Sequence, residues 1–488
     1  MTLSEVPSLI GCPDRPLAAV SITRVTEDSR RCIPGAIFVA ASGTKVDGHD
    51  FAPYAAAAGA VAIIGERTGF NSSAGLPYLS VTNARAALGI LAHALHGDPS
   101  RQMIVIGVTG TNGKTTTTKM VQQILRAHGD ACACFGTIGY EIGGTLYEAA
   151  HTTPFGEDLA DMFARARDAG ESHVVMEVSS HALAQERVAG IHFHCAAFTN
   201  LTQDHLDYHK DMDAYRRAKL MLFERIEGDE GFTVVNAEDP SAQAFRDASR
   251  VTCHTFGKGG KVRAVNSSIG ARMTTFTLHT PWGNTNVTMR MLGKHNVSNA
   301  LCAAAICGGL GVPVETIAAA LGSLQSVPGR FEHVDVGQEF QVIVDYAHTD
   351  DGLRNVLTAA QEICSGRVIV VFGCGGDRDK GKRPKMGRVA AELGDFAIVT
   401  SDNPRSEDPE RILLDIEVGL QHAGKQKYDD YLMILDRAEA IRTAIDTAKP
   451  GDLVLIAGKG HEDYQILGAT RIHFDDREVA RDILLERV

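Results

Sequence analysis

The sequence predicts an α/β protein of three domains, with a central P-loop-type parallel sheet and a C-terminal Rossmann-like doubly wound sheet. Three observations lead to this fold class. Short apolar runs alternate with helical patterns through the second and third parts of the chain, which is typical of parallel sheets. A loop rich in glycine and threonine directly follows one of these runs. The length of 488 residues is enough for about three domains.

The first predicted domain covers residues 1–98 and mixes short apolar runs with glycine turns. The alanine-rich stretch at 54–65 predicts a helix that leads into a strand. A second helix is predicted over 84–96, and Gly97-Asp98-Pro99 ends it because glycine and proline both interrupt helices.

The second predicted domain covers residues 99–327. The apolar run at 103–108 predicts a buried parallel strand, and the pattern after it predicts a helix from Thr115 to His128. Gly129 suits the end of that helix. Further strands are predicted at 173–178, 196–199 and 233–235, and a further helix from about Asn296 to Cys307.

The third predicted domain covers residues 328–488, with strands at 341–346, 367–373, 396–401 and 452–458. Ligands bind beyond the carboxyl ends of the strands in a doubly wound sheet. Polar clusters follow these four strands at 345–348, 375–378, 401–405 and 458–462. The charged stretch at 376–384 predicts an exposed loop in which Lys380, Lys382 and Arg383 are solvated.

Composition excludes several classes of protein. The net charge of -12 is unfavourable for nonspecific nucleic-acid binding, so nucleic acid is not an expected partner. No apolar run approaches the roughly 18 residues needed for a membrane span, and the first residues do not resemble a signal peptide. The ten cysteines show no paired CxxC motifs, so we expect reduced thiols in a cytoplasmic protein.

The loop after the first strand of the second domain predicts a phosphate-binding site. Glycines at 107, 110 and 113 let backbone N–H groups close around phosphate oxygens at a helix N-terminus. Lys114 can reach the β- and γ-phosphates, and the Thr115 hydroxyl can bind Mg²⁺. The loop departs from the strict GxxxxGK[ST] pattern, because Val108 stands where that pattern has glycine. A chance glycine-rich turn is the alternative interpretation.

Several motifs together resemble the Mur ligases and their relatives, the folylpolyglutamate synthetases. The motifs are TGTNGKTT at 109–116, EVSSH at 177–181, TNL at 199–201, DHLDYH at 204–209, AKLMLF at 218–223, GKHNVSNA at 293–300, PGRFE at 328–332 and DYAH at 345–348. They span nearly the whole chain in the family's order. The resemblance implies an ADP-forming ligase that makes an amide bond through an acyl-phosphate.

Further motifs resemble the branch of the family that adds a diamino acid. They are DSR at 28–30, HTTP at 151–154, DNPR at 402–405 and GKGHED at 458–463. The implied reaction joins UDP-N-acetylmuramoyl-L-alanyl-D-glutamate to meso-diaminopimelate in peptidoglycan precursor synthesis. L-lysine or another amino acid is the alternative acceptor. The resemblance implies a monomer whose partners are its small-molecule substrates.

Such a ligase must bring together two negatively charged groups, the γ-phosphate of ATP and the D-glutamate carboxylate. Lys114 and metal ions can offset the repulsion between them. Glu177 ends an apolar strand, where a carboxylate is costly unless it is metal-bound or paired, so a salt-bridged glutamate is the alternative. The resemblance adds His205 as a metal ligand. It also implies that Lys219 carries a CO₂-derived carbamate that binds a second Mg²⁺, whereas the residues alone suggest an ordinary solvated lysine.

The resemblance assigns the remaining binding residues. ATP would be bound by Gly110, Thr111, Asn112, Gly113, Lys114, Thr115, Thr116, Asn296, Arg330, Asp345 and His348, where Asn296 as a helix cap is an alternative. The UDP-muramoyl-dipeptide would be bound by Ser29, Thr152, Thr153, Ser179, Gln185 and Arg187, and His181 is left as structural.

The diamino acid would be bound by Arg378, Asp402, Asn403, Pro404, Arg405, Gly458 and Glu462. Its distal ammonium suits Asp402, Asn403 and Glu462. An arginine fork binds a carboxylate in bidentate fashion, which suits Arg405.

Three other classes compete with this interpretation. The first is another Mur ligase or a folylpolyglutamate synthetase, against which the N-terminal segment and DNPR argue. The second is a P-loop switch or motor, in which an Asp-ending strand would closely follow the loop helix; here the strand ends in Glu177. The third is a nucleotide-sugar binding protein, which would show no ATP turnover.

Overall fold

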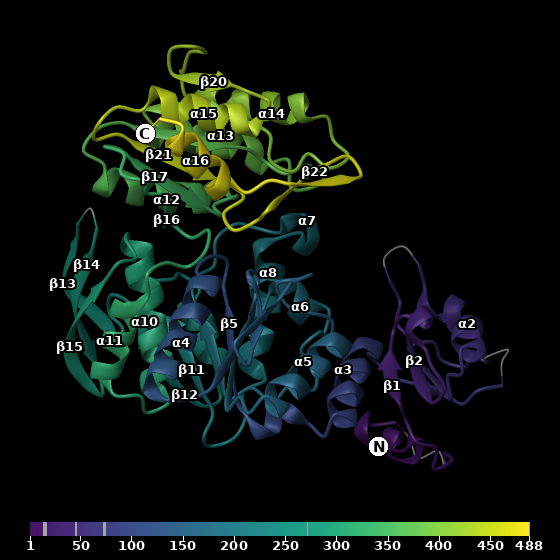
Figure 1. Cartoon of the computed structure of the whole chain (residues 1–488). Coiled ribbons are helices and arrows are strands. Elements are labelled where there is room, and N and C mark those ends of the chain that lie inside the picture. Colours follow the sequence, from purple (N-terminus) through teal and green to yellow (C-terminus); the bar gives the residue numbers. More distant parts are fainter. Residues whose placement is uncertain (13–16, 44–45, 72–74, 271, 488) are drawn as a thin grey trace.

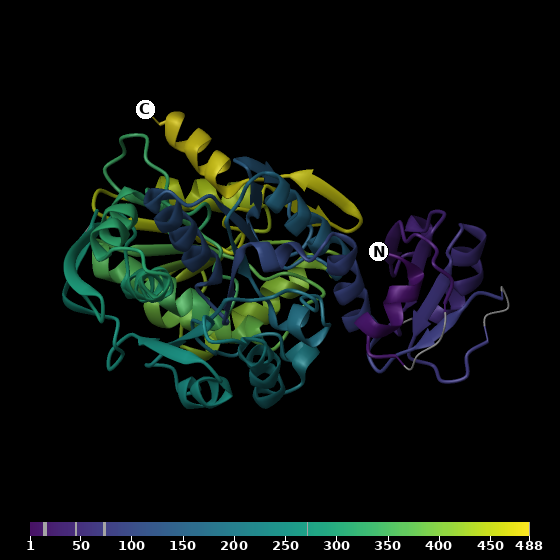
Figure 2. The same ribbon diagram turned by 90° about the horizontal axis from the view of Figure 1, so that it is seen from below.

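The computed structural model describes residues 1–12, 17–43, 46–71, 75–270 and 272–487. The chain folds into three successive α/β parts (Figure 1). In Figure 1 the first part stands to the right of the second, and the third lies above the second; in Figure 2 the first part again stands to one side. The predicted fold class is therefore confirmed.

The first part is a four-stranded parallel sheet of order β1-β2-β3-β4. Its strands are β1 (Arg24–Thr26), β2 (Ala36–Ala40), β3 (Ala62–Gly65) and β4 (Tyr78–Ser80). Helix α2 (Ala52–Ala57) leads into β3, and α3 (Ala84–Leu95) begins at Asn83, whose side chain accepts from Ala86 N–H. Helix α3 packs on α5 (Gly156–Asp168) of the second part, which joins the two parts.

The second part contains an eight-stranded sheet of order β12-β11-β10-β5-β9-β6-β7-β8. Pairings are parallel from β12 through β6 and antiparallel at β7 and β8. The strands are β5 (Ile104–Thr109), β6 (Cys132–Gly136), β7 (Gly139–Ile142), β8 (Thr145–Tyr147), β9 (His173–Glu177), β10 (Cys195–Phe198), β11 (Phe232–Asn236) and β12 (Thr252–Phe256).

Helices cover both faces of this sheet and bring the motifs to one edge. They include α4 (Lys114–His128), α6 (Ser180–Ala184), α7 (Leu206–His209), α8 (Met212–Glu224), α9 (Ala242–Ala248) and α10 (Lys294–Gly309). Helices α4 and α10 share one core cluster with β5, while α5 and α8 share a second. Because β5, β9 and β10 are parallel neighbours, the residues after them meet at the same edge.

A three-stranded antiparallel sheet flanks α10. It consists of β13 (Arg263–Ile269), β14 (Thr274–Thr280) and β15 (Gly283–Met289), and α11 (Val314–Ser323) packs on β15. No strand is predicted for these residues from the sequence. These strands are rich in threonine, serine and asparagine, and only scattered residues such as Phe276 and Leu278 are buried.

The third part is a six-stranded sheet of order β16-β17-β21-β18-β19-β20, in which only β16 is antiparallel. The strands are β16 (Glu332–His333), β17 (Gln341–Asp345), β18 (Val368–Phe372), β19 (Phe396–Val399), β20 (Tyr431–Met433) and β21 (Leu453–Ala457). A hairpin of β22 (Tyr464–Leu467) and β23 (Thr470–His473) follows.

Helices lie on both faces of this third sheet, as predicted for a doubly wound fold. One core cluster joins the sheet to α12 (Asp350–Ile363), α13 (Lys382–Leu393) and α14 (Pro409–His422). The other joins it to α15 (Arg437–Thr447) and α16 (Asp476–Leu485). In the described residues, no helix combines the length and apolar character that a membrane crossing requires. All ten cysteines are free thiols.

The prediction that Arg383 is solvated in an exposed loop at 376–384 is wrong. Helix α13 begins at Lys382, and the Arg383 side chain is 1% exposed. Its guanidinium donates to Glu407 at 2.9 Å and to Asp415 at 2.9 Å. Burial of an arginine is tolerated because carboxylates pair with it. Lys382 is half-buried and donates to the His348 carbonyl at 2.8 Å.

Candidate active site

The phosphate loop connects β5 to α4 with a geometry that glycine permits. Gly113 has φ +85°, and a Cβ there would meet the Asn299 side chain. Gly110 has φ +150°, and a Cβ there would meet the Thr199 hydroxyl. Lys114 Nζ donates to the carbonyls of Gly110 and Thr111, at 2.9 Å each, so the ammonium lies over its own loop.

Two residues of the TNL motif hold this loop from β10. Thr199 Oγ1 donates to the Asn112 carbonyl at 2.6 Å. The Asn200 side chain makes two hydrogen bonds with the Asn112 backbone. Its Oδ1 accepts from Asn112 N–H at 2.9 Å, and its Nδ2 donates to Asn112 O at 3.0 Å. The TNL motif is part of the family resemblance, but the sequence does not predict that it supports the phosphate loop.

Glu177 lies at the end of β9 and is buried. Thr137 N–H donates to its Oε1 at 2.8 Å, and Thr137 Oγ1 donates to its Oε2 at 3.2 Å. Within the described residues, no ion pair includes this carboxylate. The salt-bridged alternative is therefore wrong, and the buried Glu177 carboxyl group is held by neutral donors of Thr137.

Lys219 on α8 is a buried lysine rather than a solvated one. Its side chain is 1% exposed, and Nζ donates to the Gly110 carbonyl at 2.8 Å. The ammonium also lies 4.5 Å from the centre of the Tyr215 ring. Burial, reinforced by the nearby Lys114, holds the pKa of Lys219 well below its ordinary value. Burial therefore favours the neutral amine form of Lys219 more than in an exposed lysine.

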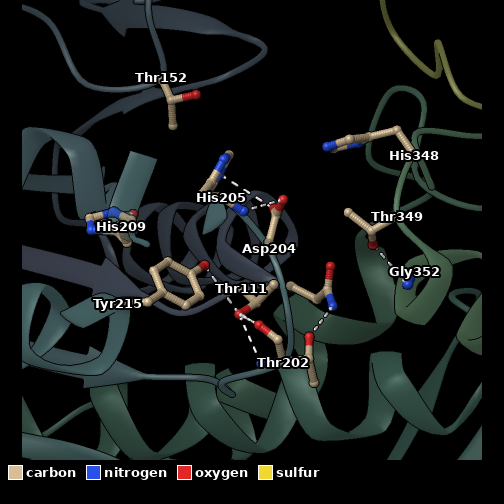
Figure 3. A network of polar contacts seen from close by, with 12 residues as sticks. Thr111, Thr152, Thr202, Asp204, His205, His209, Tyr215, His348, Thr349 and Gly352 are labelled. Atoms are coloured by element: carbon tan, nitrogen blue, oxygen red, sulfur yellow. Dashed lines mark hydrogen bonds and ion pairs between the residues drawn. The ribbon is translucent and has the colours of Figure 1, made fainter. Parts of the chain in front are cut away.

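His205 and its neighbours form a polar network beside the loop (Figure 3). His205 Nε2 lies 3.3 Å from Asp204 Oδ2, and Tyr215 OH lies 3.2 Å from Thr111 Oγ1. His205 has φ +54°, an uncommon conformation for a residue other than glycine. Burial lowers the pKa of its imidazole. The His181 ring packs 4.7 Å from the His205 ring, consistent with a structural role for His181.

A cavity opens between the second and third parts of the chain. Seven of the residues predicted for ATP line it: Asn112, Gly113, Thr116, Asn296, Arg330, Asp345 and His348. Residues that were not predicted also line it, namely Asn200, His295, Asn299, Tyr346, Thr349 and Asn355. The other predicted residues, Gly110, Thr111, Lys114 and Thr115, belong to the adjoining phosphate loop.

Arg330 reaches across this cavity to the phosphate loop. Its Nη2 donates to Thr115 Oγ1 at 3.0 Å, and its guanidinium lies 4.6 Å from the centre of the Tyr346 ring. Asp345 is fixed by Phe331 N–H and Ala347 N–H, each at 2.7 Å. Burial raises the pKa of Asp345 although Arg330 opposes this shift.

Asn296 lies at the start of α10 and is 2% exposed. Its Nδ2 donates to the Leu292 carbonyl at 2.8 Å, and its Oδ1 accepts from Asn299 Nδ2 at 3.2 Å. The side chain therefore ties the first turn of the helix to Leu292, just before it, and also lines the cavity. The helix-cap alternative is wrong, because the cap position of α10 is Gly293 and no side chain of the described residues caps this helix. His348 lies opposite, and burial lowers its pKa to about 4.

Five of the six residues predicted for the muramoyl-dipeptide lie together beside Glu177. Ser179 N–H donates to Thr153 Oγ1 at 3.1 Å, and Arg187 Nη1 donates to Thr153 O at 2.9 Å. Arg187 Nε also donates to Gln185 Oε1 at 3.0 Å. Thr152 Oγ1 lies 3.1 Å from Thr137 Oγ1, the residue that holds Glu177. No hydrogen bond of the described residues links Ser29, in the first part, to this group.

The residues predicted for the diamino acid gather beyond β19 and β21. Asn403 Nδ2 donates to Glu462 Oε2 at 2.9 Å, and Asp402 is 8% exposed. Gly458 has φ +122°, and a Cβ there would meet Asp402 Oδ2 at 2.7 Å. The Arg405 backbone follows Pro404 with φ +53°.

The two arginines of this group differ in their surroundings. Arg405 Nη1 donates to the Gly376 carbonyl at 2.7 Å. Arg378 is exposed and donates to the Asp377 carbonyl at 3.1 Å. Lys459, which sequence reasoning missed, is fully buried between Gly458 and Glu462. Among the described residues, no three His, Cys, Asp or Glu side chains come close enough to hold a metal ion by themselves.

Family models match three consecutive stretches of the chain. They are "Mur ligase family, catalytic domain" at 21–96, "Mur ligase middle domain" at 108–307 and "Mur ligase, glutamate ligase domain" at 329–460. Together they cover most of the 488 residues.

The relatives and solved structures agree with the family models. A UDP-N-acetylmuramoyl-L-alanyl-D-glutamate--2,6-diaminopimelate ligase of Geobacillus kaustophilus is 48% identical, over 96% of this chain and 95% of its own. The ligase of the same name from Gloeobacter violaceus is 44% identical, over 100% of this chain and 99% of its own. A solved structure of such a ligase has a TM-score of 0.71 at 31% identity, and covers 100% of this chain and 99% of its own. This chain belongs to the Mur ligase family.

Proposed function

We propose that this protein is an ATP-dependent, ADP-forming ligase that adds meso-diaminopimelate to the D-glutamate γ-carboxylate of UDP-N-acetylmuramoyl-L-alanyl-D-glutamate. The product is a precursor of peptidoglycan. The observation that carries this proposal is near full-length identity of 44–48% to relatives named for this reaction. We place the enzyme in the cytoplasm as a monomer, with domains at 1–98, 99–327 and 328–488.

ATP is the nucleotide that this site suits best. A MurF ligase of Thermotoga maritima, whose fold this chain shares with a TM-score of 0.62, was solved in complex with ADP. In this chain the phosphate loop, its helix N-terminus and Lys114 provide the donors that phosphates need. The adjoining cavity, lined by Asn296, Asp345 and His348, would hold the nucleoside.

The reaction needs two steps. A γ-carboxylate oxygen of D-glutamate attacks the γ-phosphorus of ATP, so that ADP leaves and an acyl-phosphate forms. The neutral amine of the acceptor then attacks the acyl carbon, inorganic phosphate leaves and the nitrogen loses a proton. Lys114 and Arg330 both lie at the phosphate loop and would offset the negative charge that gathers in the first step.

The residues near the loop also suit Mg²⁺ when phosphates supply further oxygens. Glu177 is a buried carboxyl group that forms no salt bridge among the described residues, and Thr115 offers a hydroxyl at the start of α4. We assign Thr115, Glu177 and His205 as protein ligands of two Mg²⁺ ions. Bound Mg²⁺ would neutralise phosphate charge.

Lys219 fits a carbamate. Carbamylation requires a neutral amine, and burial favours that form at Lys219. The product is an anion with two oxygens, which would replace a buried cation by a metal ligand. The position of Lys219 Nζ, 2.8 Å from the Gly110 carbonyl, keeps this group beside the phosphate loop. We therefore include the carbamate of Lys219 among the Mg²⁺ ligands.

The other two substrates would bind on either side of this centre. Thr152, Thr153, Ser179, Gln185 and Arg187 adjoin Glu177, so the dipeptide would approach the loop there, while Ser29 would contact the UDP end. The diamino acid would lie beyond β19 and β21. Arg405 and Arg378 would bind carboxylate, and Asp402 and Glu462 would bind ammonium, with Asn403, Pro404 and Gly458 shaping the site.

The test is phosphate release by the purified protein with ATP, Mg²⁺ and the UDP-muramoyl-dipeptide, adding meso-diaminopimelate or L-lysine in turn. We expect release with diaminopimelate, and a product heavier by one diaminopimelyl residue. Release with L-lysine alone would keep the mechanism and overturn the acceptor. No release with either would contradict the proposed function.

A further inference from the structure

Lys459 is a fully buried lysine in the C-terminal polar cluster of Asp402, Asn403, Arg405 and Glu462, and it takes no part in the reaction proposed for this site. It lies two residues after the end of β21, and its side chain is 0% exposed. Its Nζ donates to Asn403 Oδ1 at 3.1 Å and lies 3.5 Å from Glu462 Oε2. The Tyr464 ring centre is 5.6 Å away. A lysine buried so completely needs partners, and these are two residues of the candidate diamino-acid site.

Lys459 determines which way the Asn403 amide faces. The atom of Asn403 that contacts Lys459 Nζ also contacts Ile466 N–H, at 2.9 Å. Both partners can only donate, so this atom must be the amide oxygen. The amide nitrogen therefore faces Glu462, to which it donates at 2.9 Å. With its oxygen occupied, Asn403 can offer a ligand only its second N–H, which suits a carboxylate rather than the ammonium expected from the sequence.

Lys459 also sets the charge of the cluster. Asp402 and Glu462 are two neighbouring carboxylates, and burial together with Asp402 raises the pKa of Glu462, whereas Lys459 lowers it. Arg437 does not balance them alone, because its guanidinium makes two bonds of 2.7 Å to Asp476. When both carboxylates are ionised, they and Lys459 together carry one negative charge, which a single ammonium of the ligand would neutralise.

We propose that Lys459 is a positioning residue that adapts this site to a zwitterionic amino-acid end. The ammonium would be bound by Glu462 and Asp402, and the carboxylate by Asn403 Nδ2 and Arg405. This inference rests on the proposed function. It also explains how the site would favour meso-diaminopimelate over L-lysine, because the distal end of L-lysine has the ammonium and lacks the carboxylate.

The first test compares Lys459→Met with the wild-type ligase in the phosphate-release assay. We expect KM for meso-diaminopimelate to rise about tenfold or more, since a charged hydrogen bond is lost, with KM for ATP within about twofold. Lys459→Gln keeps a donor for Asn403 but no charge, so its KM for meso-diaminopimelate should lie between those of wild type and Lys459→Met. Lys427→Met is the matched control, because Lys427 is a half-exposed lysine of the same sheet's surface.

The second readout is the pH dependence of KM for meso-diaminopimelate between pH 6.5 and 8.5. Without Lys459, the pKa of Glu462 rises further, so KM of Lys459→Met should fall as pH increases and more Glu462 ionises. Wild type should change less. The other charged or titratable groups that face Glu462 are Asp402, Arg437, Tyr346 and Tyr464, and all are unchanged in the variant.

The outcomes separate this inference from the proposed function. If wild type is active with diaminopimelate and both variants keep its KM and pH profile, the role of Lys459 is overturned and the function stands. If both variants fail to fold by circular dichroism, Lys459 serves stability and the inference is again overturned. If wild type itself shows no diaminopimelate-dependent release, the proposed function fails first.

Discussion

Arg405 is the residue whose removal should most selectively affect the diamino acid. Its guanidinium lies at the C-terminal cluster, bonded to the Gly376 carbonyl, far along the chain from the phosphate loop. Arg405→Ala should raise KM for meso-diaminopimelate about 10- to 100-fold and leave KM for ATP unchanged, because a bidentate carboxylate contact is lost. Steady-state kinetics with each substrate varied would measure this. Arg411→Ala, an exposed arginine on α14, is the control. Equal rises in both KM values would refute the assignment.

Lys219 should make the rate depend on CO₂. The neutral amine reacts with CO₂ to give a carbamate and a proton, so the carbamate forms less readily as pH falls. We expect the wild-type rate to drop severalfold in CO₂-depleted buffer below pH 7 and to recover on adding bicarbonate. Lys219→Ala should lose nearly all activity, and bicarbonate should not restore it. A wild-type rate that is independent of CO₂ would argue against the carbamate.

The burial of Lys459 and Arg383 could not be predicted from the sequence. Each lies among charged residues and glycines, a context typical of a solvated loop. Their burial follows from residues that are distant along the chain. Arg383 on α13 contacts Asp415 on α14 and Glu407 just before it. Lys459, after β21, contacts Asn403, after β19. By contrast, Glu177 ends an apolar run, so its burial could be predicted from the sequence alone.

The phosphate loop and its helix form the element on which nucleotide binding depends. Gly113→Ala should weaken ATP binding about tenfold or more, because Gly113 has φ +85° and the new methyl group would meet Asn299. Isothermal titration with ATP would measure the dissociation constant. Gly129→Ala, at the other end of α4, is the matched control, since its φ is +104° but open space surrounds it. Unchanged affinity in Gly113→Ala would show that the loop binds phosphate differently.

Whole elements were predictable where burial left a clear pattern. The buried strands β5, β9, β18 and β21 each appear as an apolar run, and α4 begins and ends at glycines. The sheet of β13–β15 was missed because it is half-exposed and rich in small polar residues. Its strands are stabilised by pairing with one another and by α11, contacts that no local pattern reveals.

At the scale of the molecule, the nucleotide cavity depends on how the third part docks on the second. Asp351, at the start of α12, accepts from Asn112 Nδ2 at 2.7 Å and from Thr202 Oγ1 at 3.0 Å. These bonds tie the third part to the phosphate loop. The sequence contains all three residues but could not predict that positions more than a hundred residues apart would meet, since that depends on the packing of whole domains.

Removal of the Asp351 contact should loosen this docking. Asp351→Ala leaves Asn112 and Thr202 without their shared acceptor, so we expect a larger radius of gyration by small-angle X-ray scattering and a higher KM for ATP. Asp350→Ala is the control, because Asp350 is its neighbour on α12 and makes no hydrogen bond to the phosphate loop among the described residues. Identical scattering from wild type and Asp351→Ala would show that this contact does not hold the parts together.

In the proposed reaction, an acyl-phosphate on the dipeptide is the intermediate through which the D-glutamate carboxylate is joined to the diamino acid. The most direct measurement uses UDP-N-acetylmuramoyl-L-alanyl-D-glutamate labelled with ¹⁸O in the γ-carboxylate, together with ATP, Mg²⁺ and meso-diaminopimelate. Mass spectrometry would follow the label in the released phosphate. With an acyl-phosphate intermediate, we expect one ¹⁸O atom in each phosphate and a product extended by one diaminopimelyl residue. Unlabelled phosphate, or phosphate release without that product, would contradict it.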